Sequence, residues 1–122
     1  MRPVLERVKN GQDEGFVATH TLAEVYAVLT RLPGPDQVPS SMAWRLITEN
    51  VLKDFTVVGL SPKEYANTLA EVAANGVEGG KTYDALILAA AAKSGADRIY
   101  TTNVRHFQDL AGDQLRQRIT SP

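Results

Sequence analysis

The chain has 122 residues, of which 43% are hydrophobic and 22% are charged. These values are typical of one ordinary globular domain and exclude a disordered chain, because enough apolar side chains are present to build a core. Thirteen Lys and Arg against fourteen Asp and Glu leave a net charge of −1, so contact with a nucleic acid would need a local basic face. The sequence has no cysteine, which excludes disulfides and thiolate sites, and it has no apolar stretch long enough for a membrane span; we expect a cytoplasmic protein.

The first half of the chain alternates helical and strand-like segments. Apolar residues at helical spacing predict a short helix over 3–10, with no apolar strand before it. A brief apolar run over 15–19 predicts a strand, and a longer helix is expected to begin at Thr21 and to end at a proline-rich stop. Another helix is expected over 42–52, and the β-branched run 54–60 predicts a second strand.

The second half continues this alternation. Ser61-Pro62-Lys63-Glu64 carries a complete helix-start signature, and a glycine-rich connector over 75–80 leads to an alanine-rich helix. The expected elements are helices over 61–74, 84–94 and 104–110, a third strand over 97–101 and a small edge strand over 115–119. Strands and helices that alternate with short connections are typical of an α/β fold with a parallel sheet flanked by helices, here as a single domain over 1–122.

Three segments place an acid or its amide at the start of a helix, and these residues are Glu24, Asp84 and Asn103. Strand ends and the helix starts that follow them meet at one edge of a parallel sheet, so we expect one site built from all three, with Thr102 in support. Carboxylates that gather repel one another unless a cation neutralises them, and Mg²⁺ or Mn²⁺ takes oxygen ligands. Such an ion activates water for hydrolysis of a phosphodiester.

Each of these residues also has an ordinary structural explanation. Thr21 and Glu24 match a capping box, an acid at Asp84 interacts favourably with a helix dipole, and Asn103 is a suitable N-cap. The conjunction of the three favours a shared site, and capping does not exclude metal binding.

Other side chains are weaker site candidates. His20 and His106 have no ligand-like spacing, so we interpret them as surface or structural residues, with His106 packed behind the site. Trp44, Tyr26 and Tyr65 can stack on RNA bases, but their helical spacing among aliphatic residues favours core or dimer contacts.

Three longer strings carry a resemblance to a known family: residues 22–29 (LAEVYAVL), 83–87 (YDALI) and 101–107 (TTNVRHF). In this order and spacing they resemble the PIN domain, particularly the VapC-like ribonuclease toxins of bacterial toxin–antitoxin pairs. The resemblance implies a Rossmann-like parallel sheet, Mg²⁺- or Mn²⁺-dependent cleavage of RNA, a homodimer, and inhibition by a small VapB-like antitoxin. On the matching positions, Glu24 and Asp84 fall on the second and third acids of the family, and Asn103 falls on the fourth.

One part of the family pattern is missing from the chain. The first acid of the family is an aspartate at the end of an opening strand, and this chain has neither, so we expect an in-frame upstream stretch that encodes both. An unpaired strand edge at this gap predicts association through the apolar faces around Val4-Leu5-Val8 and Trp44-Ile47-Val51. The leading hypothesis is a metal-dependent endoribonuclease. The alternative is a catalytically impaired PIN-like protein that acts as an antitoxin- or RNA-binding module, whereas a nucleotide-binding domain is disfavoured because the glycine fingerprint is absent.

Overall fold

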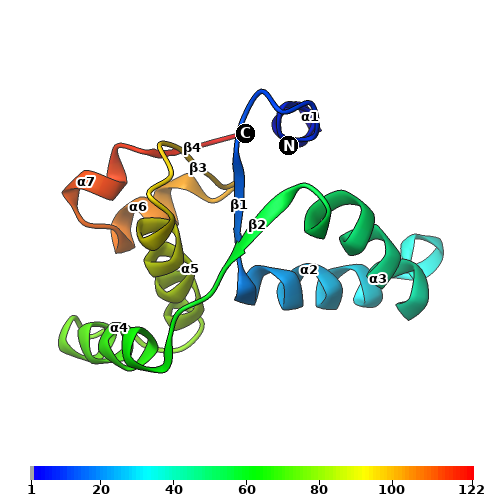
Figure 1. Ribbon diagram of the computed structural model, residues 1–122. Coiled ribbons are helices and arrows are strands. Elements are labelled where there is room, and N and C mark those ends of the chain that lie inside the picture. Colours follow the sequence, from blue (N-terminus) through cyan, green and yellow to red (C-terminus); the bar gives the residue numbers. More distant parts are fainter. Residues whose placement is uncertain (1) are drawn as a thin grey trace. The chain divides into compact units, whose positions relative to one another are not determined.

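Helices and short strands alternate along the chain, which confirms the predicted α/β class (Figure 1). The computed structural model describes residues 2–122. The chain forms two compact units, and the boundary between them falls after Val57. Among the described residues, no helix is both long enough and apolar enough to cross a membrane.

The first unit, which ends at Val57, combines helices with one pair of strands. Its elements are α1 (Arg2–Lys9), β1 (Gly15–Ala18), α2 (Thr19–Arg31), the 3-10 turn η1 (Gly34–Asp36), α3 (Ser40–Ile47), the π-helical segment η2 (Thr48–Leu52) and β2 (Phe55–Val58). The strands β1 and β2 pair with each other, and α2 packs beside α3. The helix α1 ends where expected, because Gly11 adopts a positive φ of 77° that favours glycine.

Gly15 allows β1 to pack closely against its neighbours in the first unit. A Cβ at this position would lie 2.7 Å from the Phe55 ring and 2.7 Å from Cγ1 of Val8. Val8 belongs to α1 and Phe55 to β2, and both separations are shorter than real Cβ contacts. A side chain at residue 15 would therefore push β1 away from both elements.

The second unit, Val58–Pro122, is helical with a short parallel strand pair. Its helices and strands are α4 (Pro62–Ala74), α5 (Lys81–Ser94), β3 (Ile99–Tyr100), α6 (Val104–Leu110), α7 (Asp113–Arg116) and β4 (Ile119–Thr120). The strands β3 and β4 run parallel, with Ile99 opposite Ile119. The helix α5 packs against both α4 and α6, and its Leu86, Leu88 and Ala90 are buried.

The predicted start of α4 is confirmed. The Ser61 N–H donates to Oε1 of Glu64 (2.8 Å), and the Glu64 N–H donates to Oγ of Ser61 (3.1 Å). Nζ of Lys93, near the end of α5, donates to the same Oε1 of Glu64 (2.7 Å) and to the Gly59 carbonyl (2.8 Å). These bonds, first that from Lys93 and then that from the Ser61 backbone, lower the pKa of Glu64 to about 2.

Several predicted boundaries differ from the structure. The helix expected over 42–52 is α3 followed by η2, α5 begins at Lys81 rather than at residue 84, and β3 covers only two of the residues expected over 97–101. The helix α2 begins at Thr19 and takes Ala18 as its N-cap with no side-chain cap bond, so the capping box of Thr21 and Glu24 is wrong. The small strand expected over 115–119 forms only from its last residue onward. A helical turn forms before Ile119, since the Arg116 N–H donates to the Gly112 carbonyl (2.9 Å), and the strand β4 begins only at Ile119, where β3 pairs with it.

The apolar faces expected to mediate association are largely internal. Val4, Val8 and Ile47 are buried in the core of the first unit. Met42 and Trp44, on α3, are instead 53% and 58% exposed. The apolar side chains that α3 exposes are therefore Met42, Trp44 and, at 37%, Leu46, whereas Ile47 is buried.

Candidate functional site

Asp84 and His106 form a hydrogen-bonded pair in the second unit. Asp84 lies in the first turn of α5 and His106 in the first turn of α6, and Oδ2 of Asp84 is 2.7 Å from Nε2 of His106. The two side chains are 25% and 26% exposed. A carboxylate can only accept, so the imidazole donates through Nε2. This bond joins two helix starts that are 22 residues apart in the sequence.

His106 therefore differs from its expected role as packing behind the site. It does meet the edge of Phe107, with ring centroids 6.0 Å apart and ring planes at 83°. Its direct contact, however, is the candidate acid itself. No local spacing signals this contact, because the two residues are 22 positions apart in the sequence.

Asn103 occupies the N-cap position of α6, as predicted, but its side chain makes no cap bond. Its carbonyl accepts from the Phe107 N–H (3.2 Å), and its own N–H donates to Oγ1 of Thr101 (3.1 Å). The Thr101 N–H in turn donates to the Thr120 carbonyl (3.1 Å), which fixes this turn to β4. The side chain that orders the turn is thus that of Thr101, whose Oγ1 accepts from the Asn103 N–H. The supporting role of Thr102 stays a prediction.

Glu24 lies on α2 in the first unit. Its Oε1 is 3.0 Å from Nε2 of His20, one helical turn earlier, and the Glu24 and His20 side chains are 48% and 36% exposed. An exposed pair of this kind contributes little to stability. Because Glu24 belongs to the first unit and Asp84 and Asn103 to the second, their convergence on one site stays a prediction.

The donor set of the second unit is suited to Mg²⁺ or Mn²⁺. Among the described residues, no three His, Asp or Glu side chains gather as a metal cage. Mg²⁺ does not need such a cage, since it keeps several waters and binds one or two carboxylates together with phosphate oxygens of a substrate. Asp84 and Asn103 carry hard oxygen donors of this kind, and the bond from His106 involves only Oδ2 of Asp84.

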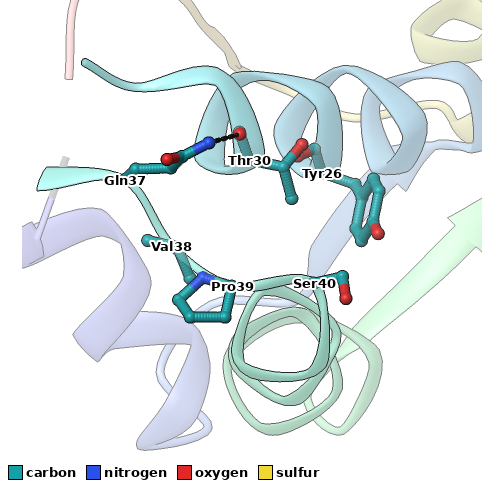
Figure 2. Close-up of a pocket in the computed structure, with 6 residues that line it drawn as sticks. All are labelled: Tyr26, Thr30, Gln37, Val38, Pro39 and Ser40. Carbon is teal, nitrogen blue, oxygen red and sulfur yellow. Dashed lines mark hydrogen bonds between the residues drawn. The ribbon is translucent and has the colours of Figure 1, made fainter. Parts of the chain in front are cut away.

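A hollow of about 420 Å³ lies elsewhere, in the first unit, where α2, η1 and α3 meet (Figure 2). It is lined by Tyr26, Thr30, Gln37, Val38, Pro39 and Ser40. Nε2 of Gln37 donates to the Thr30 carbonyl (2.9 Å), which holds the linker against α2 (Figure 2). No carboxylate lines this hollow, so it is not the predicted acidic site.

Comparison with known proteins identifies the family. The PIN domain family model matches residues 2–113. The chain therefore belongs to the PIN-domain family. It is also 34% identical over 84 residues to Ribonuclease VapC27 of Mycobacterium tuberculosis, a region that covers 69% of this chain and 59% of that protein. This similarity confirms the predicted likeness to VapC proteins, and no solved structure gives a significant match.

Proposed function

We propose that this chain is a metal-dependent endoribonuclease that hydrolyses RNA phosphodiester bonds. The observation that carries the proposal is the Asp84–His106 pair, which holds an acid at the start of α5 against the helix that follows Asn103. Membership of the PIN family and the similarity to a protein named a ribonuclease support this reaction class. A bound Mg²⁺ or Mn²⁺ ion would polarise a phosphoryl oxygen and activate a water molecule.

The proposed ligands are Glu24, Asp84 and Asn103. Asp84 supplies negative charge at a fixed position, because its carboxylate is anchored through Oδ2. Asn103 supplies a neutral amide oxygen, which makes the site less negative than an aspartate would. Glu24, from the first unit, is the second carboxylate, and Thr102 supports the turn that carries Asn103.

The partners follow from the same proposal. We infer an RNA substrate and a small VapB-like antitoxin, which membership of the PIN family and the similarity to VapC27 support, and we propose in addition a homodimer and a cytoplasmic location. The exposed Met42 and Trp44 on α3 are the apolar side chains that we assign to the dimer contact. Their exposure fits a surface that another protein covers.

The test is RNA cleavage by the wild-type chain with Mg²⁺ or Mn²⁺, with and without a chelator, beside two variants. Asp84→Ala should abolish cleavage while the chain stays folded, because losing one part-exposed hydrogen bond to a charged group costs less than about 3 kcal/mol. Asp109→Ala, which changes an exposed acid on α6, is the matched control and should cleave normally. Cleavage that persists in the chelator or in Asp84→Ala would contradict the proposal. RNA binding without cleavage would favour the catalytically impaired alternative.

A further inference from the structure

The chain contains two histidines, and each contacts a carboxylate of the proposed site. The two contacts differ in kind. His20 and Glu24 are one turn apart on the same helix, and their side chains are 36% and 48% exposed. His106 and Asp84 lie on different helices, are only about a quarter exposed, and are separated by 2.7 Å. The contact between His106 and Asp84 can therefore hold the Asp84 carboxylate between α5 and α6, whereas the contact between His20 and Glu24 stays within one helix.

The geometry assigns to His106 the role of a positioning residue for Asp84. Its Nε2–H donates to Oδ2, so the carboxylate cannot rotate freely about its last bond and Oδ1 is presented in one direction. Both partners stand in the first turn of a helix, and α5 packs against α6, so neither backbone needs to move for the bond to persist. The assignment rests on the proposed function, because it gives His106 its effect through a metal ligand.

The expected size of the effect follows from the chemistry of outer-shell partners. Groups that hydrogen-bond a ligating side chain typically change metal affinity or activity by about 10- to 100-fold when they are removed. His106 donates a charge-assisted bond to the carboxylate, and such bonds are about twice as strong as those between neutral groups. We expect His106→Ala to weaken Mn²⁺ binding by about 10- to 100-fold.

Two other roles for His106 predict different results. As a direct metal ligand, His106 would coordinate through Nδ1, because its Nε2 contacts Asp84. Both amide atoms of glutamine lie one bond farther from the backbone than Nδ1, so glutamine and alanine would lose such a ligand equally. As a purely structural link, His106 would affect the free energy of unfolding and leave the Mn²⁺ dissociation constant unchanged. A positioning residue predicts rescue by His106→Gln, whose amide N–H can donate to Oδ2 from a similar distance.

The experiment measures the Mn²⁺ dissociation constant by electron paramagnetic resonance for the wild-type chain, His106→Ala, His106→Gln and the exposed control Asp109→Ala. Circular dichroism and urea denaturation confirm that each variant is folded. The expected order of affinity is wild type equal to Asp109→Ala, then His106→Gln, then His106→Ala. Equal affinity in wild type and His106→Ala, or equal losses in the alanine and glutamine variants, would overturn the positioning role and leave the proposed function standing.

A second readout needs no metal. At a pH where free imidazole is neutral, ¹⁵N nuclear magnetic resonance (NMR) reports which ring nitrogen of His106 carries the proton. We expect the proton on Nε2 in the wild type and a mixture of tautomers in Asp84→Ala. A proton on Nδ1 in the wild type would overturn the assignment directly. A wild-type chain that binds no Mn²⁺ would instead refute the proposed metal-dependent function, whichever tautomer is found.

Discussion

Nζ of Lys93 lies 2.7 Å from Oε1 of Glu64 and so joins the last turn of α5 to the first turn of α4. The bond from Lys93 is the largest cause of the lowered pKa of Glu64, about 2 against an ordinary 4.5. When the pKa of a carboxyl is lower in the folded chain than in the unfolded chain, the carboxyl stabilises the fold. This contribution is fully present at pH values above the pKa of the unfolded chain. That contribution is lost as the pH falls from about 4.5 towards 2, and it is modest because both side chains are 42% exposed.

We therefore expect Glu64→Gln to lower the urea midpoint of unfolding at neutral pH. The difference from the wild type should shrink as the pH falls below 4.5 and should be lost only below about pH 2, where Glu64 is protonated in the folded wild type too. Urea denaturation at a series of pH values measures this. The control is Glu71→Gln, an exposed position on α4, where we expect a change within about 0.5 kcal/mol. A Glu64→Gln difference that stays constant over this pH range would contradict the role given to the Lys93 bond.

Gly15→Ala should destabilise the first unit by about 1–3 kcal/mol, the usual cost of forcing an extra group into a packed site. The new Cβ would lie 2.7 Å from Phe55 and Val8, so β1 or its neighbours must shift. Gly80→Ala is the matched control, because nothing lies within 4 Å of a Cβ there and its backbone is helical. Chemical denaturation compares the two variants. If they proved equally stable, the close packing of β1 would be refuted.

Trp44→Arg should convert a dimer to a monomer, because Trp44 is 58% exposed on α3 and is assigned to the dimer contact. An exposed position tolerates the change with little effect on folding, within about 0.5 kcal/mol. Sedimentation velocity at micromolar concentration measures the association. Tyr65→Arg, at a 45% exposed position on α4, serves as the control and should remain dimeric. A wild-type chain that is strictly monomeric at this concentration would contradict the proposed dimer.

Sequence patterns predicted the fold best where the structure depends on local chemistry. The start of α4 follows from Ser61 and Glu64, whose reciprocal bonds need only a spacing of three residues. The end of α5 follows in the same way from Gly95, which adopts a φ of 72°. The predicted start of α2 at Thr21 is two residues late, because Thr19 and His20 give no local signal for a helix start and the helix uses Ala18 as its N-cap without a side-chain cap bond.

Local sequence patterns do not predict contacts between residues that are far apart in the chain. Leu115 and Ile119 fit either a strand or a helical turn, and the partner that decides between them is β3, about twenty residues earlier in the chain. The Asp84–His106 bond joins residues 22 positions apart, so no local spacing predicts it. The order of the motifs predicted Asp84 and Asn103 at the starts of two helices, and the packing of α5 against α6 then brings His106 to Asp84.

The central claim is that residues of both units bind one metal ion, and paramagnetic NMR tests it without any activity assay. Mn²⁺ broadens the signals of nuclei close to it, so substoichiometric Mn²⁺ should broaden the backbone signals around Glu24, Asp84 and Asn103 together. Asp84→Ala should abolish the broadening at all three segments. Broadening confined to one unit, or broadening around Glu24 that survives in Asp84→Ala, would contradict a shared site.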